Sequence, residues 1–263
     1  VVALLEDIAA QNRSTAELVC FLGAGAYDHY IPSVVDAVIS RPEFYTTYTP
    51  YQAEASQGLL QSIYEYQSMI CALTQMDVSN ASLYDAGTAV GEAAIMAAGI
   101  TNRSRAVASR AVHPHYRQVL STYTSELGMR VGEVDYSEGV TDVAALKERL
   151  DESAACVIVQ YPNFFGCVET LAPIAAAAHA VGALLIVCVD PIALGLFTPP
   201  GELGADIVVG EGQPLGVPKG FGGPFLGIFA CRQEYLWRIP GRIVGATVDA
   251  DGRAAYTLTL QTR

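Results

Sequence analysis

Leu184-Leu185-Ile186-Val187-Cys188-Val189-Asp190 is an unbroken apolar run, rich in branched side chains, that ends in a single acid. A run of this kind is typical of a parallel strand buried on both faces of its sheet. A second apolar segment, Ile207-Val208-Val209, leads into Gly210-Glu211-Gly212-Gln213-Pro214 and then a glycine-rich stretch ending Gly220-Phe221-Gly222-Gly223-Pro224. Because α/β sheets bind ligands at the carboxyl ends of their strands, these residues predict a ligand site there.

Helices and strands alternate along the rest of the chain. The predicted helices are 53–76, 88–98, 115–127, 142–150 and 173–181, and the predicted strands are 106–109, 129–134, 154–159, 184–189, 206–209 and 225–230. Apolar residues recur at helical spacing in the first set, and short apolar segments define the second. This alternation predicts an α/β fold with a mostly parallel, doubly wound sheet covered by helices on both faces.

Length, composition and charge limit the possible function classes. The 263 residues, 51% of them hydrophobic and 16% charged, are enough for one large α/β domain with a buried core. The formal net charge is −12, whereas binding to phosphate backbones needs a basic face, so we expect no nucleic-acid partner.

The apolar region 171–189 is long enough to suggest a membrane span, but it is interrupted. An alanine-rich helical segment ends at Gly182, and a strand follows it. Glu6 and Asp7 break the first apolar stretch, which argues against a signal peptide. We therefore expect no membrane segment.

The cysteines have neither a CxxC spacing nor the density of a disulfide framework. They are Cys20, Cys71, Cys156, Cys167, Cys188 and Cys231. This pattern predicts packing roles for the thiols, no metal site, and a reducing, cytoplasmic location.

One candidate binding segment is Tyr84-Asp85-Ala86-Gly87-Thr88-Ala89-Val90-Gly91-Glu92, which opens a helix of small residues. Backbone amides at a helix start, together with the Thr88 hydroxyl, could hold an anion. The alternative is that Gly87 and Thr88 only cap the helix, since threonine is a favoured N-cap residue.

Three further candidates follow predicted strands. His113 carries a ring that could stack on a planar ligand. Asp190 is either a turn or helix cap or the partner of a ring nitrogen. Tyr161-Pro162-Asn163-Phe164-Phe165-Gly166 is predicted to form a turn with an aromatic rim.

Four longer strings are similar to one protein family. They are Phe21-Leu22-Gly23-Ala24-Gly25-Ala26-Tyr27-Asp28-His29-Tyr30-Ile31-Pro32, Tyr45-Thr46-Thr47-Tyr48-Thr49-Pro50-Tyr51-Gln52-Ala53-Glu54, Pro240-Gly241-Arg242-Ile243-Val244-Gly245 and Leu258-Thr259-Leu260-Gln261-Thr262-Arg263. With the order of the candidate segments, they make the chain resemble the P-proteins of the glycine cleavage system. The resemblance is specifically to the first (alpha) subunit of the two-subunit type, and it covers essentially the whole chain.

The resemblance implies a fold and a cofactor. The fold is the aspartate aminotransferase-like large domain of fold-type I enzymes that depend on pyridoxal phosphate (PLP), with a mostly parallel seven-stranded sheet between helices. P-proteins decarboxylate glycine on PLP and pass the aminomethyl group to the lipoyl arm of the H-protein. In the two-subunit type the beta subunit carries the cofactor lysine in a His-Lys pair, and Gln213-Pro214 stands at the matching place here.

A proline has no side-chain amine, so it cannot hold PLP covalently. The resemblance therefore implies no catalytic residue in this chain alone and PLP in the partner beta subunit. It also implies lipoylated H-protein and glycine as further partners. Gly87, Thr88, His113, Asp190 and Pro214 become remnants of a duplicated cofactor pocket.

The resemblance further implies that segments of this subunit complete the partner's active site. Tyr45, Tyr48, Tyr51 and Gln52 are the expected contribution, because tyrosines in a loop favour an interface. The alternative is that they cover this domain's own core. Gly23-Ala24-Gly25-Ala26-Tyr27-Asp28-His29-Tyr30 is a second, weaker candidate for the same role.

The chain has two lysines, Lys147 and Lys219. Lys147 is expected to be a solvated charge. Lys219 lies beyond Pro214 in Val217-Pro218-Lys219-Gly220, which indicates a turn rather than a strand end. An autonomous PLP enzyme that uses Lys219, and a structural module without PLP chemistry, remain alternative functions.

Three regions are expected. Residues 1–52 form an N-terminal segment with interface loops, 53–240 the PLP-transferase-like large domain, and 241–263 a connection towards a missing C-terminal domain. Relatives in this family carry additional sequence on both sides, so the connection is expected to be either poorly ordered here or packed in a non-native way.

Overall fold

The computed structural model describes residues 1–14, 17–19, 21–220 and 224–259. Cys20, residues 221–223 of the glycine-rich stretch and residues 260–263 of the last string lie outside the described residues. Within the described ranges, none of the helices is both long and apolar enough to cross a membrane.

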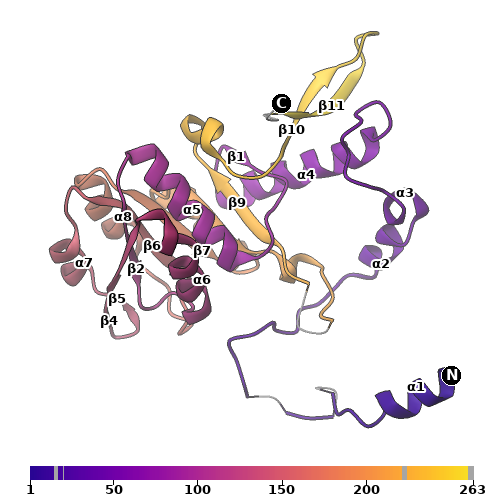
Figure 1. Cartoon of the computed structure of the whole chain (residues 1–263), viewed down its shortest axis with the longest axis horizontal. Helices are drawn as coiled ribbons and strands as arrows, with labels where there is room; N and C mark the ends of the chain where they lie inside the picture. The colour runs from indigo at the N-terminus through magenta and orange to yellow at the C-terminus, as the bar shows by residue number, and fades with distance from the viewer. Residues whose placement is uncertain (15–16, 20, 221–223, 260–263) are drawn as a thin grey trace.

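A seven-stranded sheet forms the centre of the described structure (Figure 1). Its strands are β1 (Val78–Ser79), β2 (Arg105–Ser109), β3 (Arg130–Val134), β6 (Ala154–Tyr161), β7 (Leu184–Val189), β8 (Ile207–Glu211) and β9 (Gly227–Cys231). They lie in the order β1-β9-β8-β7-β6-β2-β3, and β9 runs antiparallel to both of its neighbours while the other pairs are parallel. The mostly parallel seven-stranded sheet is therefore confirmed.

Helices cover both faces of this sheet. They are α4 (Gln57–Thr74), α5 (Ala86–Thr101), α6 (Pro114–Thr124), α7 (Val143–Arg149) and α8 (Leu171–Ala180). Residues of α5 and α6 belong to one hydrophobic core, and residues of α4, α7 and α8 belong to another.

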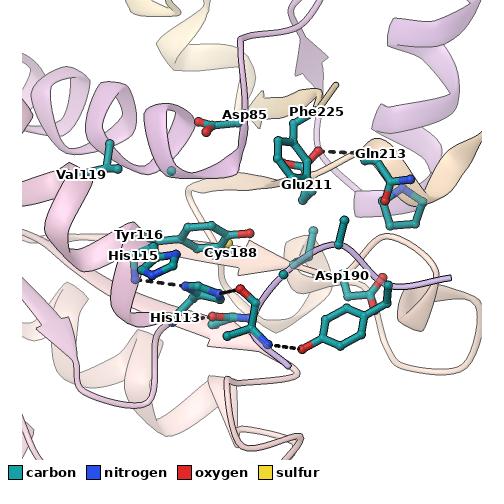
Figure 2. A pocket seen from close by; sticks show the side chains of 18 of the residues that line it. Asp85, His113, His115, Tyr116, Val119, Cys188, Asp190, Glu211, Gln213 and Phe225 are labelled. Carbon is teal, nitrogen blue, oxygen red and sulfur yellow. Dashed lines mark hydrogen bonds between the residues drawn. The ribbon is translucent and has the colours of Figure 1, made fainter. Parts of the chain in front are cut away.

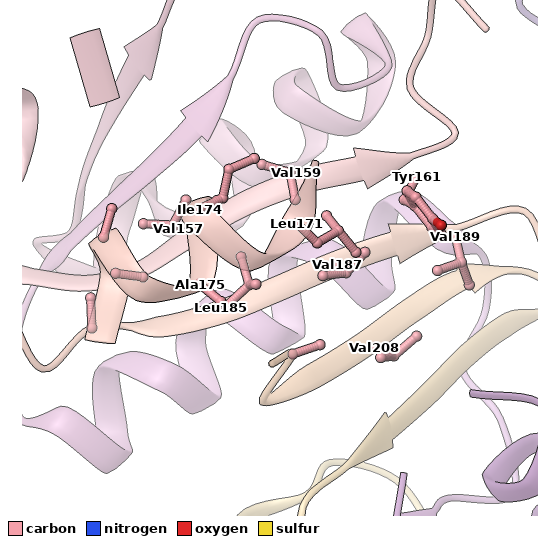
Figure 3. Packing of buried hydrophobic residues seen from close by; sticks show 14 of the residues in the cluster. Val157, Val159, Tyr161, Leu171, Ile174, Ala175, Leu185, Val187, Val189 and Val208 are labelled. Atoms are coloured by element: carbon pink, nitrogen blue, oxygen red, sulfur yellow. The ribbon is translucent and has the colours of Figure 1, made fainter. Parts of the chain in front are cut away.

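Successive residues of the central strands alternate between the two cores. Val157 of β6 and Leu185 of β7 pack against α8 (Figure 3). Ile158 and Ile186 belong instead to the core that contains α5. All four side chains are fully buried. This is why these strands are apolar at every position rather than at alternate ones.

The glycines of α5 allow α6 to pack closely against it. A Cβ on Gly91 would lie 2.8 Å from two ring atoms of Tyr123, closer than carbon atoms can approach. The small residues of this helix therefore bring α6, and with it His113 at its start, close to the start of α5.

The helices of the N-terminal part lie away from the sheet (Figure 1). They are α1 (Val2–Ala9), α2 (Ser33–Ile39) and α3 (Pro42–Tyr45), and none of these helices buries a residue. A small antiparallel pair, β4 (Tyr136–Ser137) and β5 (Val140–Thr141), lies between β3 and α7 in the sequence.

Beyond residue 240 the chain forms an antiparallel hairpin of β10 (Ile243–Val248) and β11 (Ala254–Thr259). Gln67 of α4 pairs with the backbone of Val244 through two hydrogen bonds of 2.9 Å, one donated and one accepted. Gln57 pairs with Tyr256 in the same way at 2.8 Å. The described part of the expected connection is therefore a regular hairpin attached to α4.

Candidate functional site

The carboxyl ends of β6, β7 and β8 face the start of α5 across a pocket with a volume of about 280 Å³ (Figure 2). Four residues predicted from the sequence line it, namely Gly87, His113, Asp190 and Pro214. The predicted strand ends thus meet at one place, as parallel topology requires.

Asp85, rather than Thr88, is the N-cap of α5. The Asp85 carboxylate accepts a hydrogen bond of 2.7 Å from the Thr88 amide, and the Thr88 hydroxyl accepts one of 3.2 Å from the Asp85 amide. The same hydroxyl donates to the Asp85 carbonyl at 3.0 Å. This reciprocal arrangement is a capping box, so Thr88 serves the cap from the third helical position.

Glu211, at the end of β8, reaches across to the same helix start. Its Oε2 accepts from the Ala86 amide at 3.2 Å, and its Oε1 accepts from the amides of Gln213 at 3.0 Å and Leu226 at 2.8 Å. Burial raises the pKa of this carboxyl above its ordinary value and the nearby Asp85 adds to that, although the three amides act in the opposite direction.

His113 is the N-cap of α6, and its ring has a neighbour on several sides. Nδ1 accepts from the His115 amide at 3.1 Å, which leaves Nε2 to donate to the Ala24 carbonyl at 3.2 Å. The ring stacks on Tyr116 with centroids 4.5 Å apart, and Phe164 of the predicted aromatic turn meets it edge-on at 5.0 Å. Burial lowers the pKa of His113, in keeping with a neutral ring.

Asp190 and Pro214 stand at the predicted strand ends but are engaged in local structure. The Asp190 carboxylate accepts from the Ile192 amide at 2.9 Å, so Asp190 caps a turn. Pro214 lies in a short 3-10 helix, Gln213–Leu215, directly after β8. Of the two interpretations of Asp190, the turn cap is present in the structure.

Lys219 forms an ion pair with Asp28. Its Nζ lies 2.5 Å from the carboxylate of Asp28. The neighbouring segment Ala24–Tyr27 lies at the mouth of the pocket, where the Tyr27 hydroxyl accepts from the Ala24 amide at 2.7 Å. In the single chain this part of the Gly23–Tyr30 segment therefore lies over the chain's own pocket.

The tyrosine loop lies apart from this pocket. Tyr48, Tyr51 and Gln52 line a separate shallow hollow of about 500 Å³. The Tyr51 hydroxyl accepts from Arg242 at 2.9 Å, and Tyr48 packs edge-on against Tyr51 at 6.3 Å. Tyr45 and Tyr48 are 82% and 81% exposed, so they do not cover this chain's own core in the structure.

Tyr116 and Gln160 were not predicted as site residues, and Asp85 and Glu211 were predicted only as members of longer candidate segments without a role of their own. Tyr116 could have been found, because it follows His113 by three residues on one helix face. Burial, followed by the nearby Cys188, Glu211, Asp85 and Asp190, raises the pKa of Tyr116. Gln160 accepts from the His113 amide at 2.8 Å and so fixes the start of α6.

Among the described residues, no group of three or more histidine, cysteine and acidic side chains is placed to hold a metal ion. The pocket is instead formed by aromatic rings, carboxylates and backbone groups. Such a lining can hold an organic ligand but lacks a cation to attract an anionic one.

The family model of the glycine cleavage system P-protein matches residues 1–263. The chain belongs to this family. It is 57% identical over 259 residues to the probable glycine dehydrogenase (decarboxylating) subunit 1 of Desulforamulus reducens, and 55% identical to that of Anoxybacillus flavithermus. Each alignment covers 98% of this chain but 58% of the relative, so the chain spans about 58% of the length of these P-protein subunits.

Solved structures agree with this assignment. An inhibitor-bound glycine decarboxylase (P-protein) of the glycine cleavage system matches with a TM-score of 0.93 and 44% identity, over 99% of this chain and 58% of the other. A sphingosine-1-phosphate lyase from Burkholderia pseudomallei matches over 97% of this chain and 62% of the other with a TM-score of 0.68 and 13% identity, which shows the fold alone. This chain thus has the fold-type I PLP-dependent transferase fold.

PLP does not fit the residues of this pocket. Pro214 offers no amine at the strand end, and Lys219 is paired with Asp28. Two amides at the start of α5 are bound by the carboxylates of Asp85 and Glu211. We therefore assign no chemical step to a cofactor in this chain.

Proposed function

We propose that this chain belongs to the non-cofactor-bearing subunit of a glycine decarboxylase. With a PLP-bearing partner beta subunit, the enzyme decarboxylates glycine and transfers the aminomethyl group to the lipoyl arm of the H-protein. The observation that carries the proposal is a pocket with the outline of a fold-type I site but with Pro214 where an amine is required. The relatives are named as subunit 1 of their enzyme, which supports the existence of a second, partner subunit.

The contribution of this chain to catalysis is proposed to come from its tyrosine loop. Tyr45 and Tyr48 expose aromatic rings that a partner surface would cover favourably. Tyr51 is held in place by Arg242, so the loop presents these rings from a fixed base. Together with Gln52, they are proposed to complete the pocket of the beta subunit.

The experiment is a reconstitution of the complex from both subunits and lipoylated H-protein. Release of labelled carbon dioxide from glycine is measured for Tyr45→Ala, Tyr48→Ala and Gln52→Ala. If these side chains enter the partner's pocket, turnover falls by roughly 10- to 100-fold. The PLP absorbance of the partner stays unchanged, because the cofactor itself is not disturbed.

Leu127→Ala, which truncates an exposed apolar residue after α6, is the matched control. A complex that assembles normally and turns over normally with all three loop variants would contradict the proposal and favour a purely structural module. Full activity of this chain without the beta subunit, abolished by Lys219→Ala, would favour an autonomous enzyme instead.

A further inference from the structure

The start of α5 has the geometry that usually binds an anionic ligand. Unpaired amides at a helix start, beside the carboxyl ends of parallel strands, attract phosphate groups. Here the chain supplies the anions itself. The Ala86 amide donates to Glu211 and the Thr88 amide donates to Asp85.

Glu211 is held in this position from three directions. Besides the Ala86 amide of α5, it accepts from Gln213 just beyond β8 and from Leu226 just before β9. A carboxylate that accepts three amides is fixed in orientation, and moving it aside would leave all three donors unpaired. The contact is therefore built into the fold.

The charges around the start of α5 also oppose the binding of an anionic ligand. Asp190 is a third carboxylate in the pocket lining, and no lysine or arginine of the described chain lines it. A phosphate group placed at the start of α5 would meet two carboxylates with no cation to offset them. Its binding would therefore be opposed by both occupancy and charge.

We propose that Glu211, assisted by Asp85, acts as an internal anion that excludes phosphorylated ligands, PLP included, from this pocket. The two carboxylates thereby restrict the cofactor to the partner's site, independently of the missing lysine. The choice of PLP as the excluded ligand rests on the proposed function. The observation that carboxylates occupy the amides of Ala86 and Thr88 does not depend on it.

The test uses the purified full-length protein without its partner. Binding of PLP and of inorganic phosphate is measured by equilibrium dialysis for the wild type, Glu211→Ala, and the double variant Asp85→Ser with Glu211→Gln. The double variant keeps hydrogen-bonding groups at both places and removes both charges, so it preserves the fold if Glu211→Ala does not. Glu148→Ala on α7 removes an exposed carboxylate elsewhere and is the control.

We expect no saturable binding of PLP to the wild type or the control. The variants gain affinity on the order of tenfold or more, and inorganic phosphate competes with PLP in them. Wild-type binding as tight as that of the variants would overturn the proposal. So would folded variants, verified by circular dichroism, that gain no affinity.

This result is separable from the proposed function. Exclusion of phosphate is measured on this protein alone, whereas completion of the partner's site is measured as turnover of the complex. Either proposal can fail while the other holds.

Discussion

At the scale of single residues, His113 shows how the pocket controls protonation. Its Nδ1 accepts a backbone hydrogen bond, so a proton there would break the contact with the His115 amide. Burial, together with the nearby charges of His115 and Arg117, lowers its pKa. Hence the folded state favours the neutral form of the His113 ring more than the unfolded state does.

A pH dependence follows from this. Because the folded pKa lies below the unfolded value of 6.5, the contribution of His113 to stability is complete above that value. It is lost as the pH falls through the folded pKa. Urea unfolding at about pH 7 and about pH 5 should therefore show a smaller decrease in unfolding free energy for His113→Gln than for the wild type.

An identical decrease in the wild type and His113→Gln would show that His113 does not titrate in the unfolding transition. The neutral ring assigned to His113 would then be wrong.

Residues at strand ends could be placed in the pocket from the sequence, because apolar runs mark where strands stop. Asp190 and Pro214 were found in this way. Glu211 was visible in the same loop, yet its role depends on Ala86 and Leu226, which only the folded chain brings to it. Roles that arise from such long-range contacts have no local signal.

At the scale of elements, two glutamine side chains of helix α4 hydrogen-bond to the backbone of the C-terminal hairpin. Gln57 and Gln67 each offer one donor and one acceptor to the hairpin backbone, which is what a neighbouring strand would offer. The two side chains thereby attach the hairpin to the helix at two points.

Replacing Gln67 with leucine should weaken this attachment. The buried backbone N–H and C=O of Val244 would lose their partners, at a cost of about 2–3 kcal/mol in unfolding free energy. Hydrogen exchange at the Val244 amide should accelerate in parallel. Gln61→Leu, at an exposed position of the same helix, is the control, and equal effects of both substitutions would contradict this account.

The helices and strands of the sheet were predictable because their apolar spacing is strong. The predicted strand 184–189 coincides with β7, and helix 88–98 lies within α5. The hairpin was not predicted, because its attachment rests on the glutamine side chains of a helix far away in the sequence. The short helices α1 to α3 bury nothing, so no core pattern marks them.

At the scale of the whole molecule, the single chain leaves a large aromatic and apolar surface uncovered. Tyr45, Tyr48, Phe21 and Leu22 are all more than 80% exposed. Side chains of this kind are unfavourable in water and are typical of interfaces. All four residues belong to segments that precede α4 in the sequence.

Tyr48→Ala should therefore change association more than stability. Because the ring is exposed, the unfolding free energy of the chain should change by less than about 0.5 kcal/mol. If the ring is central to the interface, affinity for the beta subunit should fall by about 2 kcal/mol, roughly 30-fold in Kd. Isothermal titration calorimetry measures this, and an unchanged Kd would place Tyr48 outside the interface.

We propose that the partner subunit, and not this chain, holds the cofactor. Reducing the assembled, PLP-loaded complex with borohydride fixes the cofactor to the lysine that holds it, and mass spectrometry then weighs each subunit. We predict a pyridoxyl adduct on the beta subunit and none on the subunit that contains this chain. An adduct on Lys219 or Lys147 would contradict the account.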